Sequence, residues 1–352
     1  MKSRVRTDEV DRSPEIRAER GENLIPFGVS YLDDALVGIE KEDLVLIGAH
    51  SGAGKTELAT TIALRAAESG KKAFYFALEA SPLEIESRIL YKLMCKHFFS
   101  DPERPRVELD YANWYYGLLP EVYTYDILAQ EEFKSRYGHF LTFYKESKFE
   151  LADFIREFSE ASSAGADLIV IDHAHYFDWG EKTEAVGLRD IITAARDLNL
   201  MNQVPVVLIS HLRKRDFKTE LVTPRLEDFH GSSELYKRST KVITLDSGES
   251  LGNGLIESFM TCLKFRARGE VVRYTAQINF SFKTNSYERE YTIGKSNQKR
   301  GSEFEEVARD DMPGWARNAR RSSGYHRDVT PEPSVSDDQR RDRFAQSLPY
   351  KD

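Results

Sequence analysis

A glycine-rich segment around residue 52 has the residue types of a phosphate-binding loop. An apolar run over residues 44–47 precedes it and a helix-like stretch over residues 58–67 follows, which is the order of strand, loop and helix that such a loop requires. Backbone N–H groups of the loop and the positive end of the helix can then surround a phosphate chain. The residues expected at the nucleotide are Ala49, Ser51, Gly52, Ala53, Gly54, Lys55, Thr56 and Glu57.

Two side chains of this loop carry its chemistry. We expect Lys55 to contact the β- and γ-phosphates and Thr56 to bind Mg²⁺. The alternative is a glycine-rich turn in which the Lys-Thr pair occurs by chance, and the flanking strand and helix disfavour it. The segment therefore predicts binding of ATP together with Mg²⁺.

Two carboxylates directly follow apolar runs that are typical of buried strands. Asp172 ends the run over residues 168–171, and we expect it to hold Mg²⁺ through the water shell of the ion. Glu79 ends the run over residues 74–78, and we expect it to orient and deprotonate the attacking water. Each feature is weak by itself, because strands often end in a surface carboxylate. Their order after the phosphate-binding loop favours the catalytic interpretation.

Three further side chains fit roles in ATP hydrolysis. His211 ends the apolar run over residues 206–210 and is placed to sense the γ-phosphate, with a buried core histidine as the alternative. Lys264 and Arg266 alternate on a late strand and so share a face. Two cations there predict a charge-stabilising finger that reaches into the site of a neighbouring subunit. Their alternative is an ordinary edge strand on which cations discourage aggregation.

A basic segment follows His211 directly. It contains five cations in a chain with a net charge of −8, so nucleic-acid binding must come from local loops of this kind rather than from a global basic field. We expect these side chains to contact the phosphates of single-stranded DNA. They are Arg213, Lys214, Arg215, Lys218 and Arg225.

Composition limits where the chain acts. It has 352 residues and two distant cysteines, Cys95 and Cys262, which form neither a disulfide framework nor a metal site. The N-terminal residues lack the apolar core of a signal peptide. No apolar run approaches the roughly 20 residues that span a bilayer. The sequence therefore predicts a cytoplasmic location and no membrane partner.

The order of the elements predicts an α/β fold. Helical stretches over residues 55–68, 82–97, 150–164 and 184–200 alternate with apolar strands, which indicates a mostly parallel sheet with helices on both faces. The last strands lack intervening helices and predict an antiparallel or mixed edge. The strands are expected over residues 44–48, 73–78, 140–144, 167–172, 204–210, 241–245, 258–265 and 271–280.

Three segments divide the chain. Residues 1–22 are charged and predict a flexible arm or linker, or a helix that forms only against a partner. Residues 23–299 form the expected ATPase domain. Residues 300–352 are rich in Gly, Ser, Pro, Asp and Arg and predict a disordered tail. Within the domain, residues 98–138 are rich in aromatic side chains, which indicates packing more than base stacking.

Four segments together resemble the C-terminal ATPase domain of DnaB-type replicative helicases. Residues 25–28 look like the lead-in to the nucleotide loop, and residues 76–81 look like the strand of the catalytic glutamate. Residues 225–232 are similar to the DNA loop, and residues 264–269 look like the trans-acting lysine and arginine finger. The resemblance covers about residues 24–285. It implies a RecA-like P-loop NTPase fold, ATP hydrolysis, a ring-shaped oligomer that is expected to be a hexamer, and replication or loader proteins as partners.

The sequence also departs from that family. His211 stands where replicative helicases usually carry glutamine, and a histidine there resembles the plasmid RepA-type hexameric helicases. Ser51 stands where the loop often has proline, and residues 1–22 cannot form the N-terminal primase-binding domain. Two function classes stay open on the sequence. One is an ATP-driven helicase or translocase on single-stranded DNA. The other is a RecA-like ATPase switch that binds a protein or DNA partner without unwinding.

Overall fold

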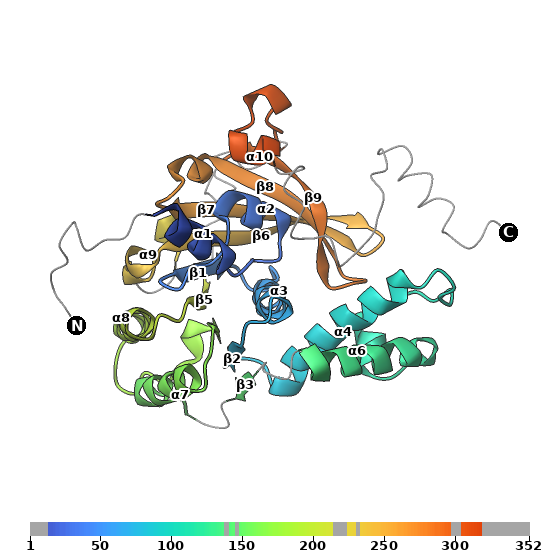
Figure 1. Ribbon diagram of the computed structural model, residues 1–352, viewed down its shortest axis with the longest axis horizontal. Coiled ribbons are helices and arrows are strands. Elements are labelled where there is room, and N and C mark those ends of the chain that lie inside the picture. The colour runs from blue at the N-terminus through green and yellow to red at the C-terminus, as the bar shows by residue number, and fades with distance from the viewer. Residues whose placement is uncertain are drawn as a thin grey trace.

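A mixed sheet forms the centre of the computed structural model (Figure 1), which describes residues 13–136, 141–144, 148–213, 224–229, 233–296 and 304–318. Within these residues the sheet has nine strands in the order β3-β2-β4-β5-β1-β6-β7-β8-β9. The strands are β1 (Leu44–Ala49), β2 (Ala73–Ala77), β3 (Leu141–Tyr144), β4 (Leu168–Asp172), β5 (Val206–His211), β6 (Lys241–Gly252), β7 (Leu255–Phe265), β8 (Tyr274–Ser281) and β9 (Ser286–Lys295).

Strand direction divides the sheet into two parts. Every pairing from β3 to β6 is parallel. The pairings of β6, β7, β8 and β9 are antiparallel. The predicted fold class, a mostly parallel sheet with an added antiparallel edge, is therefore confirmed. It follows from the sequence because helices connect the parallel strands and short turns connect the last four.

Helices lie on both faces of the parallel part (Figure 1). Alternate residues of β1 explain this arrangement. Val45 and Ile47 belong to one buried cluster, whereas Leu44 and Leu46 belong to the other. The α-helices are α1 (Pro14–Glu22), α2 (Ser30–Leu36), α3 (Lys55–Glu68), α4 (Pro82–Ser100), α5 (Tyr111–Tyr115), α6 (Tyr123–Arg136), α7 (Leu151–Ser163), α8 (Glu184–Asn202), α9 (Glu234–Arg238) and α10 (Gly314–Asn318). The 3-10 helices are η2 (Pro120–Val122), η3 (Ala174–Tyr176), η4 (Leu226–Asp228), η5 (Gly269–Arg273) and η6 (Arg309–Asp311).

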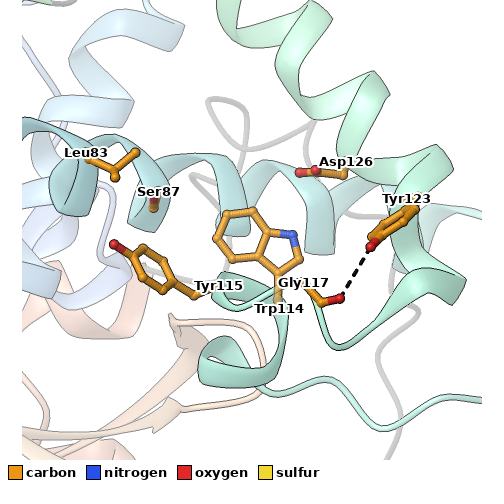
Figure 2. A pocket seen from close by; sticks show the side chains of 7 residues that line it. All are labelled: Leu83, Ser87, Trp114, Tyr115, Gly117, Tyr123 and Asp126. Carbon is orange, nitrogen blue, oxygen red and sulfur yellow. Dashed lines mark hydrogen bonds between the residues drawn. The ribbon is translucent and has the colours of Figure 1, made fainter.

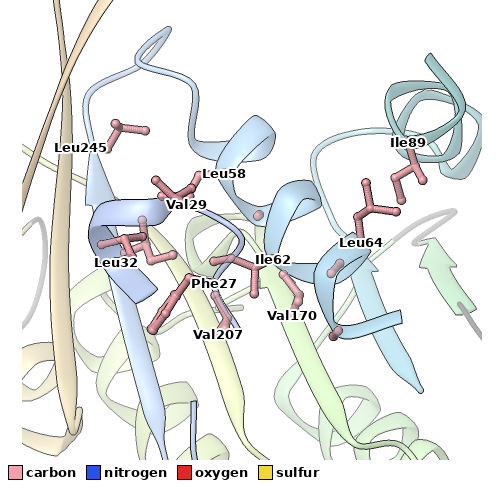
Figure 3. Close-up of a cluster of buried hydrophobic side chains, with 14 of the residues drawn as sticks. Phe27, Val29, Leu32, Leu58, Ile62, Leu64, Ile89, Val170, Val207 and Leu245 are labelled. Atoms are coloured by element: carbon pink, nitrogen blue, oxygen red, sulfur yellow. The ribbon is translucent and has the colours of Figure 1, made fainter. Parts of the chain in front are cut away.

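The first cluster fixes helix α3 behind the phosphate-binding loop. Leu58 and Ile62 of α3 belong to this cluster together with Val170 of β4 and Val207 of β5 (Figure 3). Phe27 of the lead-in segment belongs to the same cluster and is fully buried. Burial of one large apolar side chain contributes about 1.5–3 kcal/mol to folding. The helix that carries Lys55 and Thr56 is therefore held in place by apolar packing against the sheet.

The antiparallel edge extends further than the sequence indicated. Strand β6 continues to Gly252, and β9 was not expected at all. Strand β9 has three consecutive charged residues, Glu288, Arg289 and Glu290, between Tyr287 and Tyr291, and most of its side chains are exposed or half-buried. An antiparallel edge strand with one solvent-exposed face needs no continuous run of apolar residues. The search for apolar runs in the sequence therefore did not identify β9.

The structure also differs from the expected tail over residues 304–318. Val307 donates a 2.8 Å backbone hydrogen bond to Ile293 of β9, and Glu306 forms a bridge with Gly294. The Trp315 ring lies 6.1 Å from the ring of Tyr31 and 6.1 Å from that of Tyr274. A few apolar residues among many polar ones suffice to attach this segment. The prediction of a tail stays a prediction for residues 319–352, which lie outside the described residues.

The N-terminal helix buries fewer of its side chains than the segment over residues 304–318. Helix α1 begins after Ser13, whose side chain accepts a hydrogen bond from the Ile16 N–H, and no residue of α1 is buried. The prediction of an arm or linker over residues 1–22 is untested and stays a prediction. Within the described residues, no helix combines the length and the apolar character that a bilayer crossing requires.

Candidate active site

The phosphate-binding loop joins β1 to α3, as the sequence predicts. Gly52 and Gly54 adopt φ angles of 80° and 89°, a region that favours glycine, and Gly54 is the N-cap of α3. Lys55 is the first residue of the helix and is only 8% exposed. Its ammonium donates a 3.0 Å hydrogen bond to the carbonyl of His50 and so lies across the loop. Burial lowers the pKa of Lys55, and the charges of Asp172 and Glu79 oppose that shift.

Asp172 ends β4 as a buried carboxylate. It is 2% exposed, and its Oδ2 accepts a 2.7 Å hydrogen bond from the Tyr75 hydroxyl of β2. Burial raises the pKa of Asp172, and the hydroxyls of Tyr75 and Thr56 oppose the shift. Among the described residues no hydrogen bond of good geometry reaches its Oδ1.

The surroundings of Asp172 fit Mg²⁺. An under-satisfied buried carboxylate oxygen is costly, and the nearby Thr56 hydroxyl adds a second hard oxygen donor. No group of three or more His, Cys, Asp or Glu residues in the described part of the chain could hold a metal ion. A single carboxylate with one hydroxyl suits Mg²⁺, which keeps several waters and takes its other ligands from substrate phosphates.

Glu79 lies just beyond β2 and next to Asp172. The N–H groups of Leu78 and Glu79 donate to the Asp172 carbonyl at 2.9 and 3.3 Å. The sheet order puts β4 and β5 between β2 and β1, so Glu79 comes to the site from a strand that is not adjacent to the loop strand. The Glu79 side chain is 43% exposed. Its charge still acts on Lys55, which places the expected base and the expected phosphate ligand at the same edge of the sheet.

Two residues that the sequence did not single out, His173 and Tyr176, contact Glu79, and His175 in turn contacts His173. The Oε2 of Glu79 lies 3.1 Å from the Nε2 atom of His173, and the Oε1 of Glu79 accepts a 3.3 Å hydrogen bond from the Tyr176 hydroxyl. His173 is 1% exposed, and its Nδ1 accepts a 3.3 Å hydrogen bond from the His175 backbone. The signal was the histidine pair directly after Asp172, at alternate positions.

His211 lies next to His173 and His175 and is therefore not an isolated histidine in the core. Its ring centroid is 4.1 Å from that of His173 and 5.4 Å from that of His175. Burial lowers the pKa of His173 to about 2, and the neighbouring His211, His175 and Lys55 act in the same direction. His173 therefore stays neutral at physiological pH. The sensor role of His211 stays a prediction.

The structure gives Glu57 a different role from the one expected. Its carboxylate forms ion pairs with Arg88 and with Lys92, both on α4, and the Lys92 ammonium lies 2.9 Å away. Burial alone would raise the pKa of Glu57, but the charges of Lys92 and Arg88 outweigh it and hold the pKa below its usual value. The side chain thus joins α3 to α4, and the expectation that Glu57 belongs to the nucleotide site stays a prediction.

The two expected finger cations have different surroundings. The Lys264 ammonium donates to the carbonyls of Tyr236, Lys237 and Ser239 at 2.8, 3.0 and 2.6 Å. It therefore caps the C-terminal end of α9 in its own chain, and its action on a neighbouring subunit stays a prediction. Arg266 lies beyond the end of β7 and is exposed. No hydrogen bond or ion pair with another described residue occupies its guanidinium.

Two of the five expected DNA contacts are described. Arg213 and Arg225 are both exposed, and they lie at the two ends of the basic segment. Both ends are tied together, because the Arg213 N–H donates to the Asp228 carbonyl at 2.7 Å and Leu212 forms a bridge with Phe229. Lys214, Arg215 and Lys218 lie outside the described residues. The segment therefore starts two residues after His211.

Helices α4, α5 and α6 form an aromatic arm at the side of the sheet (Figure 1). Tyr91, Tyr111 and Trp114 contact one another there, so packing accounts for part of the aromatic content. A cavity of about 340 Å³ remains on this arm, between α4, α5 and the start of α6 (Figure 2). It is lined by Leu83, Ser87, Trp114, Tyr115, Gly117, Tyr123 and Asp126. Its lining includes none of the expected site residues.

Comparisons with known proteins identify the family of the chain. Residues 25–254 match the family described as the DnaB-like helicase C terminal domain. The chain is 26% identical over 226 residues to a "Probable plasmid replicative DNA helicase" of Chlamydia psittaci, a match that covers 63% of this chain and 46% of that protein. The chain thus spans about half the length of this relative.

Two solved structures share the fold. One is described as an ATPase domain, with a TM-score of 0.62, 17% identity, and coverage of 78% of this chain and 94% of that one. The other is titled "The Structure Of A DnaB-Like Replicative Helicase And Its Interactions With Primase", with a TM-score of 0.64, 16% identity, and coverage of 79% of this chain and 68% of that one.

Proposed function

Because the chain belongs to the DnaB-like helicase C-terminal domain family, we propose that it hydrolyses ATP with Mg²⁺ to drive movement along single-stranded DNA. The observation that carries the proposal is the gathering of Lys55, Thr56, Asp172 and Glu79 at one edge of the parallel sheet. Ligands of such sheets bind outside the carboxyl ends of the strands. All four side chains lie at that edge or begin the helix that follows it.

Each residue has a separate task in hydrolysis. The loop N–H groups and the Lys55 ammonium would hold the triphosphate, while Thr56 and Asp172 would hold Mg²⁺. When bound, the ion neutralises charge on the phosphates. Glu79 accepts a proton from the attacking water, and its exposed carboxylate leaves room for that water.

The active unit in this proposal is a ring-shaped oligomer, with a hexamer as the expected size. Arg266 supports it, because an exposed guanidinium beyond the end of β7, on the antiparallel side of the sheet, suits the γ-phosphate of a neighbour. The Arg213 to Arg225 segment would follow the DNA backbone. Residues 1–22 would serve as a linker and residues 319–352 as a tail outside the ATPase domain. Replication or loader proteins would be further partners in the cytoplasm.

Strand displacement tests the proposal against its alternative. The wild-type chain and Lys55→Ala are incubated with ATP, Mg²⁺ and a forked duplex with a single-stranded tail. The proposal expects displacement by the wild type and none by Lys55→Ala. DNA-stimulated hydrolysis without displacement by the wild type would support a switch that binds DNA but does not unwind it.

A further inference from the structure

His173 connects two residues that belong to different steps of ATP hydrolysis. Its Nε2 lies 3.1 Å from the Oε2 of Glu79, the expected base. Its ring meets the ring of His211, the expected sensor, edge to face at a centroid distance of 4.1 Å and an angle of 79°. Since His173 is 1% exposed, its ring has little room to move independently of these neighbours.

The hydrogen bonds of His173 fix where its proton lies. Its Nδ1 accepts the N–H of His175 at 3.3 Å, so this nitrogen carries no proton. The proton of the ring then lies on Nε2, which is 3.1 Å from the Oε2 of Glu79 but makes no hydrogen bond of good geometry within the described residues. The Tyr176 hydroxyl donates to the other carboxylate oxygen at 3.3 Å. Each oxygen of Glu79 thus has a polar neighbour, a hydrogen bond at Oε1 and the close His173 ring at Oε2, although the side chain is 43% exposed and would otherwise sample several rotamers.

We propose that His173 is a positioning residue that holds Glu79 toward the attacking water and couples its orientation to His211. This inference rests on the proposed function. His211 ends β5 and lies two residues before the basic segment, so a shift of its ring on binding nucleotide or DNA reaches Glu79 through one shared side chain. The chain His211–His173–Glu79 thus gives a contiguous physical route from the sensor to the base.

Steady-state kinetics separate positioning from structural support. His173→Ala should lower kcat for ATP roughly tenfold to hundredfold, since small misplacements of a catalytic group have costs of that order. KM for ATP should change less than about threefold. His173→Gln keeps a side-chain N–H at a similar depth and should recover most of the loss. Tyr176→Phe should lower kcat less than His173→Ala. The matched control His97→Gln, on α4, should leave both constants unchanged.

Coupling requires a double-mutant cycle. The loss of kcat in His173→Ala combined with His211→Ala should be smaller than the product of the two single losses, because both changes break the same route. Losses that simply multiply would overturn the coupling. Equal kcat in wild type, His173→Ala and Tyr176→Phe would overturn the positioning role.

A spectroscopic measurement makes the inference independent of turnover. Nitrogen chemical shifts of labelled histidines at neutral pH should show His173 protonated on Nε2 alone, with the Nε2 resonance shifting in Glu79→Gln. A proton on Nδ1 would overturn the inference even if ATP is hydrolysed. This measurement also decides the matter if His173→Ala fails to fold. A wild-type chain that hydrolyses no ATP but shows the Nε2 proton would contradict the proposed function and leave the contact supported.

Discussion

The Lys92 ammonium of α4 lies 2.9 Å from the Glu57 carboxylate of α3, at a position where both side chains are buried. Arg88 completes the group and also binds Glu84 at 2.8 Å. The residue that directly follows the expected Mg²⁺ ligand Thr56 therefore serves to attach the nucleotide-binding helix to the aromatic arm. Removal of one partner from such a group leaves an uncompensated buried charge, which is far more costly than the net gain from the intact pair.

Glu57→Gln should destabilise the protein by about 3–5 kcal/mol near neutral pH. Because the pKa of Glu57 is lowered in the folded state, its contribution is present above the pKa of the unfolded chain, about 4.3, and is lost as pH falls through the lowered folded value. Urea unfolding at pH 7 and at successively lower pH measures this. The difference from wild type should shrink in acid. A difference in the free energy of unfolding that does not change with pH would contradict this role of the buried ion pairs. Weaker ATP affinity at unchanged stability would show that Glu57 contributes to nucleotide binding instead.

Lys55→Ala should abolish ATP turnover while the fold survives. Within the described residues the Lys55 ammonium makes one hydrogen bond, to the His50 carbonyl, and burial already lowers the pKa of Lys55, so its loss should have a small effect on folding. ATP hydrolysis and thermal unfolding are measured together, with the half-exposed Lys71→Ala as the matched control. Unchanged hydrolysis in Lys55→Ala would show that the loop assignment is wrong.

Arg266→Ala should bind ATP normally and lose roughly 10³-fold or more in turnover, which is the order typical of trans-acting arginine fingers. Mixing it with Glu79→Gln should restore some activity, because mixed rings contain interfaces where an intact Glu79 meets an intact Arg266. Lys264→Ala is the contrasting variant. It removes the cap of α9 and should lower the stability of the protein more than it lowers ATP turnover. Full activity of a monomer at all concentrations would exclude action in trans.

Arg213→Ala combined with Arg225→Ala should weaken binding of single-stranded DNA and flatten its salt dependence. Two lost phosphate contacts at about 0.7 each reduce the slope of log affinity against log salt by about 1.4. The backbone contacts that join the two ends of the segment do not involve these side chains, so folding should be unaffected. The exposed pair Arg189 and Arg156, each changed to Ala, is the matched control. An unchanged slope would favour the switch.

The sequence carried enough information for the sheet and the order of its motifs, for reasons that particular residues illustrate. The apolar runs that end in Ala49, Asp172 and His211 are buried strands because their side chains are apolar on both faces. Burial on both faces is typical of parallel strands between helices. The same apolar runs predict that Lys55 and Asp172 lie at the carboxyl edge of the parallel strands, where the structure has them.

Other features depended on tertiary contacts that local patterns do not encode. The sequence predicts that Lys264 and Arg266 share one strand, yet β7 ends at Phe265 and the nearby end of α9 binds the Lys264 ammonium. Tyr75 looks like an ordinary strand residue, and its hydrogen bond to Asp172 follows only from the pairing of β2 with β4. His173 was overlooked because no period identifies a histidine that turns back toward a neighbouring strand.

Single-turnover ATP hydrolysis by Glu79→Gln, with nucleotide affinity measured on the same sample, tests the central claim most directly. Glutamine keeps the shape of the side chain and removes the base. The account predicts ATP binding close to that of wild type, with hydrolysis slower by about 10²- to 10⁴-fold. Glu84→Gln, on α4 and bound to Arg88, should hydrolyse ATP at nearly the wild-type rate. Normal hydrolysis by Glu79→Gln, with loss in Glu84→Gln, would contradict the assignment of the base.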